Sequence, residues 1–435
     1  MLAPKGNQRK INILIEATKL VSDNADGIHR YVHELLSALA KLVDSHGLIG
    51  RVDIFTSRGL FYSISPIRDL YPQKQHCAQL KVAPTKLRLR MAFQRMKDAI
   101  RRQVEHLLSE TQNRRLKKLR HPLYRILCRL DPNLRFNSYN VVHLTQPQSY
   151  IHFQNCRAKM VTTVHDLTHL YFPQFHLQEN IDDANHGMQL AIKKHSEFIA
   201  VSNATRENLL AAYPVIDPGR IHVVHEACDN DRFRPVDEPE RTETVCIKYG
   251  IPAGPFFLSL STIEPRKNIL NAVDAFLLMC DENPDPCIRL VIAGKTGWKH
   301  DALMQRVAQK PDRIIITGFV EEFDLPALYS AAVALIYVSF CEGFGLPPLE
   351  AMSCGTPVVY GDNSAMREVI GKGGLAANPN DILDIKENLK KMAADRSTRD
   401  LLGKTARQRS KQFSWDRAAR QTLDVYKTLV RPPHA

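Results

Sequence analysis

Glu342 and Glu350 are two carboxylates placed around a turn where a ligand could bind. The stretch 339–359 reads SFCEGFGLPPLEAMSCGTPVV and holds Glu342 and Glu350 around a glycine-containing turn. The apolar run at residues 331–339 predicts a strand buried on both faces of a parallel sheet. Glu342 would then lie at the carboxyl end of that strand, where open α/β sheets bind ligands.

The residues after Glu342 predict a turn that runs into a helix. Gly343 and Gly345 allow the backbone to approach a ligand closely, and Pro347 fits the first turn of a helix, where a missing N–H costs little. The free N–H groups of that turn favour an anion. Glu350 lies about one turn into the helix, where a carboxylate can also be an ordinary capping group.

A histidine and an aspartate follow another predicted strand. His165 and Asp166 come directly after the apolar part of MVTTVHDLTHLYFP, residues 160–173. We therefore expect them at the carboxyl end of a strand as well. A lone His-Asp pair can serve structure or catalysis, and the residue types leave both open.

Two adjacent cations precede a predicted amphipathic helix. Arg266 and Lys267 lie in TIEPRKN, between the apolar run at residues 255–261 and the helical pattern ILNAVDAFLLM. A compact positive site before a helix N-terminus suits a diphosphate. Solvated surface charge is the alternative interpretation.

A glycine opens the helix that follows the first predicted strand. Residues 11–20 predict the strand and its exit, and from Gly27 onward Tyr31, Leu35 and Leu39 recur at helical spacing. A strand, a loop and a helix beginning at glycine can hold an anion. The loop is not G-x-G-x-x-G, so it does not predict a dinucleotide site.

The composition indicates a cytoplasmic protein of two domains. A chain of 435 residues with 44% hydrophobic content can form two globular cores. We expect neither a secretory signal nor a membrane-spanning segment, because no apolar run approaches the length that spanning needs. The nine cysteines are scattered and form no C-x-x-C pair, which favours a reducing compartment over disulfides or a zinc site.

Most of the net charge of +13 falls in one segment. Residues 85–136 hold fifteen Lys or Arg against four Asp or Glu, with apolar residues at helical spacing. Basic amphipathic helices of this kind can lie on anionic membrane surfaces. A helical pair packed on its own domain and, more remotely, nucleic-acid binding are the alternatives.

Four stretches together resemble glycosyltransferase family 4, whose retaining enzymes have the GT-B fold. They are GIHRYVHEL at 27–35, TVHDL at 163–167, EPRKN at 264–268 and the E-x7-E stretch that begins at Glu342. The resemblance implies an α/β architecture of two facing Rossmann-like domains with parallel sheets. It also implies a C-terminal helix that crosses back to the first domain.

The resemblance assigns roles around a nucleotide diphosphate sugar. The residues are Glu342 and His165 for catalysis; Arg266, Lys267 and Gly27 for the donor diphosphate; Phe344, Gly345 and Leu346 for the donor sugar, through backbone N–H groups; and Glu350 for the ribose. The family mechanism is front-face departure and attack assisted by the leaving phosphate, so neither glutamate is predicted to be a nucleophile. Many members carry an arginine where this chain has Ser261.

No metal and no further cofactor is expected, because the GT-B fold generally needs none and the nucleotide sugar is a co-substrate. Asp229 and Asp231 have the spacing of a metal-binding D-x-D motif. They fall in the stretch that resembles the family's hinge, so we do not predict a metal site there.

The favoured function is transfer of a hexose, best mannose from GDP-mannose, to a lipid-linked glycan in surface polysaccharide synthesis. The partners would be the donor, the glycan acceptor and, peripherally, an anionic membrane on the cytoplasmic side, with no nucleic acid. The alternatives are a transferase acting on a small soluble acceptor and a non-catalytic basic scaffold. The predicted domains span residues 1–235 and 236–412, and residues 413–435 form the returning helix.

Overall fold

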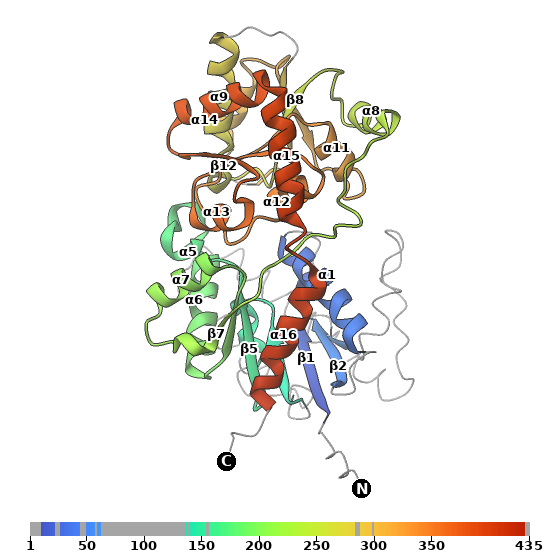
Figure 1. The fold of residues 1–435 in the computed structure, drawn as a ribbon. Helices are drawn as coiled ribbons and strands as arrows, with labels where there is room; N and C mark the ends of the chain where they lie inside the picture. The colour runs from blue at the N-terminus through green and yellow to red at the C-terminus, as the bar shows by residue number, and fades with distance from the viewer. Residues whose placement is uncertain are drawn as a thin grey trace. The chain divides into compact units, whose positions relative to one another are not determined.

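The computed structural model describes residues 10–21, 27–43, 49–56, 59–61, 136, 139–153, 156–282, 288–297 and 300–430. The chain forms two compact units (Figure 1). The first comprises residues 1–163, 182–199 and 419–435, and the second comprises residues 164–181 and 200–418. The basic segment 85–136, apart from Phe136, lies outside the described residues.

The first sheet has the strand order β3-β2-β1-β4-β5-β6-β7. Its strands are β1 (Ile11–Glu16), β2 (Ile49–Thr56), β3 (Gly59–Phe61), β4 (Val141–Leu144), β5 (Lys159–Val164), β6 (Glu197–Ala200) and β7 (Ile221–Val223). Strand β1 pairs in parallel with β2 and β4, and β4 pairs in parallel with β5. The edge strand β3 is antiparallel to β2, an exception that mixed sheets often carry at an edge.

Helix α1 (Gly27–Val43) begins at the predicted glycine and buries the predicted stripe. Tyr31, Leu35 and Leu39 are all buried. The Tyr31 hydroxyl lies 3.0 Å from Thr163 Oγ1 at the end of β5. The helix is therefore held to the sheet by both its apolar face and a buried hydroxyl pair.

The second sheet is fully parallel, with the strand order β10-β9-β8-β11-β12-β13. Its strands are β8 (Phe256–Leu260), β9 (Arg289–Ala293), β10 (Ile314–Gly318), β11 (Leu335–Tyr337), β12 (Val358–Gly361) and β13 (Gly374–Ala377). Numbered within the domain this is 3-2-1-4-5-6, the Rossmann order. The core beneath it includes Phe257, Leu290, Ile336 and Val359, each with almost no exposed surface.

The remaining helices connect these strands or follow the last of them, and α9 and α14 pack side by side in the second unit (Figure 1). They are α5 (Thr168–Tyr171), α6 (Gln178–Lys193), α7 (Asn203–Ala212), α8 (Pro239–Lys248), α9 (Ile269–Glu282), α10 (Asp301–Val307), α11 (Leu325–Ala331), α12 (Leu346–Ser353), α13 (Ser364–Ile370), α14 (Ile382–Ala394), α15 (Arg396–Ser410) and α16 (Trp415–Val430). Short 3-10 turns include η6 (Pro173–Phe175), η7 (Pro218–Arg220) and η8 (Pro265–Lys267). No helix among the described residues is long and apolar enough to cross a membrane.

The C-terminal part of α16 belongs to the first unit. The Tyr426 hydroxyl lies 2.6 Å from His143 Nδ1, and His143 Nε2 lies 2.8 Å from Thr163 Oγ1. These three side chains are fully buried. A buried and satisfied polar chain of this kind fixes the helix on strands β4 and β5.

The strand before Glu342 is shorter than predicted. We expected it over residues 331–339, but β11 covers only Leu335–Tyr337. Helix α11 runs through Ala331, whose small side chain suits a helix as well as a strand, and Ala332 caps it in an extended conformation. The predicted position of Glu342 beyond the carboxyl end of the strand is unaffected.

Candidate active site

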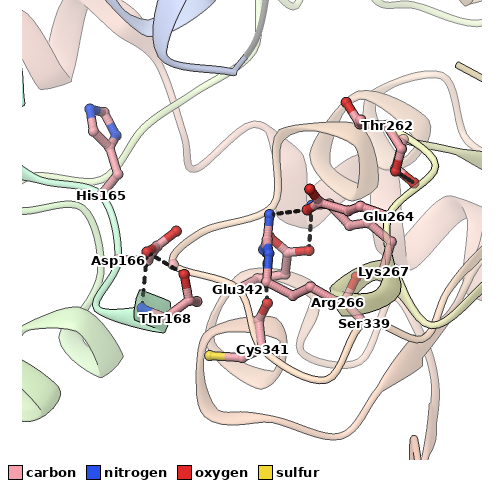
Figure 2. Close-up of polar contacts among 12 residues, drawn as sticks. His165, Asp166, Thr168, Thr262, Glu264, Arg266, Lys267, Ser339, Cys341 and Glu342 are labelled. Atoms are coloured by element: carbon pink, nitrogen blue, oxygen red, sulfur yellow. Dashed lines mark hydrogen bonds and ion pairs between the residues drawn. The ribbon is translucent and has the colours of Figure 1, made fainter. Parts of the chain in front are cut away.

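Two cations and two carboxylates converge in the second unit (Figure 2). Lys267 Nζ lies 2.6 Å from Glu342 Oε1, and Arg266 Nη1 lies 2.9 Å from Glu342 Oε2. The other amino group of Arg266 lies 2.8 Å from Glu264 Oε1. These four side chains are at most 15% exposed, so water screens their interactions only weakly.

Sheet topology explains why residues 75 positions apart meet here. Arg266 and Lys267 lie on η8, directly after β8, and Glu342 follows β11. Strands β8 and β11 are neighbours, and the strand order reverses between them. Ligands of open α/β sheets bind outside the carboxyl ends of the strands at such a switch point.

Asn268 locks the turn that carries both cations. Its backbone is left-handed, with φ 57°, a conformation that asparagine tolerates better than most residues. Its side-chain amide donates to the carbonyl of Val338 at 3.0 Å and to that of Pro379 at 2.6 Å. The backbone N–H of Phe340 also donates to the Arg266 carbonyl at 3.1 Å. The turn after β8 is therefore tied to the exit of β11.

The cluster keeps Glu342 ionised. Burial opposes the charge of this carboxylate, but Arg266 and Lys267 outweigh it and lower its pKa to about 2. Burial and the neighbouring Arg266 lower the pKa of Lys267, against the pull of Glu342. Burial also acts against the charge of Arg266, yet Glu342, Asp166 and Glu264 together raise its pKa.

Tyr337 contributes a hydroxyl from the end of β11. Lys267 Nζ donates to the Tyr337 hydroxyl at 2.9 Å and lies 5.2 Å from the centre of its ring. Burial, with the adjacent charge of Glu342, raises the pKa of this phenol well above its ordinary value. Tyr337 therefore stays neutral and orients the ammonium group.

Asp166 adds a third carboxylate to the surroundings of Arg266 (Figure 2). Its Oδ1 accepts hydrogen bonds from the Thr168 N–H at 3.0 Å and from the Thr168 hydroxyl at 2.8 Å. Burial works against its charge, but Arg266 and these two bonds lower its pKa. The aspartate is thus held as a fixed anion at the start of α5.

His165 is oriented by a residue that the sequence did not single out. Its Nδ1 lies 2.8 Å from Glu226 Oε1, and that glutamate is buried. His165 follows β5, and Glu226 follows β7. A carboxylate on one ring nitrogen fixes the orientation and the tautomer of the imidazole.

Gly343 joins the Glu342 loop to the His165 segment. A Cβ at this position would lie 1.8 Å from the His165 carbonyl oxygen, so only glycine fits. The Ser202 hydroxyl donates to the Gly343 carbonyl at 2.7 Å. Close approach was expected at this glycine, but its contact here is with the protein backbone.

The helix after the loop offers few free N–H groups. Helix α12 begins after Gly345, whose φ is 98°, and Pro347 and Pro348 have no N–H. The orphan donors of its first turn are therefore those near Gly345 and Leu346. The Phe344 ring is buried and meets the Phe413 ring edge to face, with centroids 5.6 Å apart.

Glu350 lies in α12, and Gly27 lies at the start of α1. The Glu350 side chain is fully buried, and its Oε2 accepts a hydrogen bond from the Tyr329 hydroxyl at 2.9 Å. Gly27 is the first residue of α1 and belongs to the first unit. Their assigned contacts with ribose and diphosphate stay predictions.

Sequence reasoning assigned no role to Glu226, Glu264 or Tyr337. Glu264 lies inside the EPRKN stretch, two residues before Arg266, and this short spacing could have indicated an ion pair between them. Tyr337 lies in a run that reads as apolar core, and Glu226 lies 61 residues from His165. Only the pairing of strands reveals those two contacts.

The described residues contain no group of three or more His, Cys, Asp or Glu side chains arranged to hold a metal ion. At the D-N-D stretch, Asp229 Oδ1 accepts the backbone N–H groups of Asp231 and Arg232 at 3.0 and 3.2 Å. Asp229 therefore closes a local turn.

Comparisons with known proteins match both halves of the chain. A family model described as "Glycosyl transferases group 1" matches residues 248–409, and one described as "Glycosyltransferase Family 4" matches residues 25–232. The chain is 33% identical over 287 residues to "O-antigen chain mannosyltransferase B" of Escherichia coli. That alignment covers 65% of this chain and 73% of the relative.

A second relative is much longer than this chain. The "Serotype-specific mannosyltransferase WbdA" of Escherichia coli is 30% identical over 288 residues, which is 64% of this chain and 34% of the relative. The chain thus spans about a third of that protein.

Among solved structures, the Anabaena protein HepE in complex with UDP and glucose superposes with a TM-score of 0.65 at 16% identity. The match covers 96% of this chain and 100% of HepE. Similarity at this level shows the fold alone. Together with the two sheet orders, it confirms the predicted GT-B architecture of two Rossmann-like domains.

Proposed function

The chain belongs to glycosyltransferase family 4, and we propose that it transfers mannose from GDP-mannose to a hydroxyl of a lipid-linked glycan in surface polysaccharide synthesis. The proposal includes retention of the anomeric configuration and independence from metal. The observation that carries it is the pairing of Arg266 and Lys267 with Glu342 at the switch point of the second sheet.

The charges that develop during sugar transfer are opposite in sign to the charges that this cluster supplies. The leaving diphosphate develops negative charge, and the sugar develops oxocarbenium-like positive charge. In the proposed reaction Arg266 and Lys267 stabilise the diphosphate, and the backbone N–H groups of Phe344, Gly345 and Leu346 contact the donor sugar. Two fixed cations can supply the charge that a metal ion supplies in other transferases.

Glu342 and His165 act at the sugar in this proposal. Glu342 binds sugar hydroxyls and stabilises the positive charge of the reacting centre, and His165, oriented by Glu226, contacts the sugar. The leaving phosphate oxygen takes the proton of the attacking hydroxyl on the same face, which retains the configuration. Glu350 holds the ribose.

Mannose and the polysaccharide acceptor are proposed from the relatives. The two mannosyltransferases described above are 33% and 30% identical to this chain. Their names indicate mannosyl transfer, and the name of the first indicates an O-antigen chain. GDP-mannose is the donor that we propose for this mannosyl transfer, so the proposed donor base is guanine.

The basic segment 85–136 is proposed to bring the enzyme to an anionic membrane on its cytoplasmic face, beside the acceptor. Reversing the charges of Arg114, Arg115, Lys117 and Lys118 should reduce cosedimentation with vesicles that contain anionic lipid. Unchanged cosedimentation would favour a small soluble acceptor.

Product analysis tests the proposed reaction directly. The full-length protein is incubated with GDP-mannose, UDP-glucose and other nucleotide sugars, with an acceptor glycan on a lipid carrier, in the presence and absence of EDTA. We expect transfer from GDP-mannose alone, an α-linked product by NMR and no effect of EDTA. Transfer from another donor, inversion or loss of activity in EDTA would each overturn the corresponding part of the proposal.

A further inference from the structure

The clamp proposed for the donor diphosphate already has more negative than positive charge around it. Arg266 and Lys267 supply two positive charges, and Glu264 and Glu342 pair with them directly. Asp166 acts on Arg266 as a third carboxylate. A diphosphate placed there would meet like charges in a site with little water, which costs several kcal/mol.

The other two carboxylates contact fewer of the cations than Glu342 does. Asp166 accepts two hydrogen bonds from Thr168, which hold it outside the direct ion pairs. Glu264 is buried and pairs with Arg266, two residues further along the same turn. Its displacement would therefore leave the pair between Lys267 and Glu342 intact.

Glu342 differs from them because it pairs directly with both cations. It lies in the loop between β11 and α12, which is anchored on either side by the Phe340 N–H and the Gly343 carbonyl. A rotation of its side chain would release Arg266 Nη1 and Lys267 Nζ together. No backbone bond of the loop needs to break for that rotation.

We propose that Glu342 is the displaceable counter-ion of the clamp, and that its displacement makes the enzyme prefer a nucleotide sugar to a free nucleoside diphosphate. This inference rests on the proposed function. Either ligand must displace Glu342 from Arg266 and Lys267. Both ligands carry ribose hydroxyls, but only the nucleotide sugar adds sugar hydroxyls beyond the diphosphate, which can donate to the displaced carboxylate and replace its lost bonds.

The same competition assists product release. After transfer the sugar has left, and Arg266 and Lys267 are again the cations that Glu342 can pair with. Its return to Arg266 and Lys267 competes with the bound diphosphate, so the product is held less tightly than the donor. Glu342 thus acts as a specificity-determining residue in addition to its proposed role at the sugar.

Calorimetric titration tests this with two matched pairs of probes, GDP with GDP-mannose and UDP with UDP-glucose. The wild type is compared with Glu342→Gln, which removes the competing charge, and with Glu264→Gln, which removes one charge from the same cluster. We expect Glu342→Gln to bind the nucleoside diphosphate about tenfold more tightly, the equivalent of about 1.4 kcal/mol. Its preference for the nucleotide sugar should fall by a similar factor, whereas Glu264→Gln should keep the wild-type preference.

Several outcomes overturn the inference. Weaker or unchanged diphosphate binding in Glu342→Gln contradicts a competing role for Glu342. Equal effects in Glu342→Gln and Glu264→Gln would mean that the loss of one negative charge at either position explains the result. If Glu342→Gln does not fold, Glu342→Asp replaces it, because a shorter arm weakens the ion pairs and should also tighten diphosphate binding. If the wild type binds neither pair of probes, the proposed function fails instead.

Discussion

Lys267 Nζ and Glu342 Oε1 lie 2.6 Å apart, although one follows β8 and the other follows β11. The two strands are parallel neighbours at the point where the strand order of the second sheet reverses. The sheet therefore presents a cation and a carboxylate to the same ligand position. Opposite charges in the leaving group and the sugar are what glycosyl transfer must stabilise.

Replacement of Lys267 by alanine should reduce kcat/KM by about 100-fold or more, because one well-placed electrostatic partner of the diphosphate is lost. Steady-state kinetics with the active donor measures this. Lys248→Ala is the control, since Lys248 also forms a 2.6 Å ion pair, with Asp324, but is half exposed and pairs outside the cluster. Equal losses in both variants would mean that Lys267 has only a structural role.

Removal of the Glu226 carboxylate should lower kcat more than it changes KM for the donor. The 2.8 Å bond to His165 Nδ1 positions the ring, and a misplaced catalytic group costs on the order of 10- to 100-fold in rate. Glu226→Gln keeps an acceptor oxygen and should retain more activity than Glu226→Ala. If Glu226→Ala keeps the wild-type kcat, Glu226 has no role in positioning His165.

Stability should depend on pH through Glu342. Its folded pKa of about 2 lies below the ordinary value of 4.5, so its contribution is fully present above pH 4.5 and is lost as the pH falls toward 2. The difference in free energy of unfolding between wild type and Glu342→Gln should therefore be constant near neutral pH and shrink below pH 4.5. Urea titrations at several pH values measure it, with Asp424→Asn as a control for an exposed carboxylate. A gap that widens in acid would contradict the assignment.

A side chain at Gly343 should disrupt both stability and activity. The added Cβ of Gly343→Ala would meet the His165 carbonyl oxygen at 1.8 Å, and overpacking of this kind costs about 1–3 kcal/mol or more. Gly219→Ala is the matched control, because its nearest neighbour, a side-chain oxygen of Asp217, lies at 3.4 Å. Thermal unfolding of both variants decides the matter, and equal midpoints would argue against the close packing.

Local sequence signals predicted the elements that carry the site. The helical spacing after Gly27 located the start of α1, and glycine followed by two prolines located the start of α12. The apolar runs before Arg266 and Glu342 located the strands that these residues follow. These features depend on residues that are close in sequence, so periodicity and turn chemistry reveal them.

The contacts that organise the side chains could not be predicted in this way. Glu226 meets His165 across 61 residues, and Tyr337 meets Lys267 across 70. Neither separation corresponds to the period of a helix or a strand or to the length of a turn. The ion pairs of Glu342 with both cations likewise follow from strand order, and family resemblance alone assigned Glu342 only to the sugar.

The central claim is that Arg266 and Lys267 form the diphosphate site of a sugar donor. Calorimetric titration of GDP-mannose into wild type, Arg266→Ala and Lys248→Ala tests it most directly. We expect saturable binding to wild type and to Lys248→Ala, and a loss of about 30-fold or more in Arg266→Ala, because a buried charged contact is removed. Binding of equal strength to all three proteins would show that Arg266 does not bind the diphosphate.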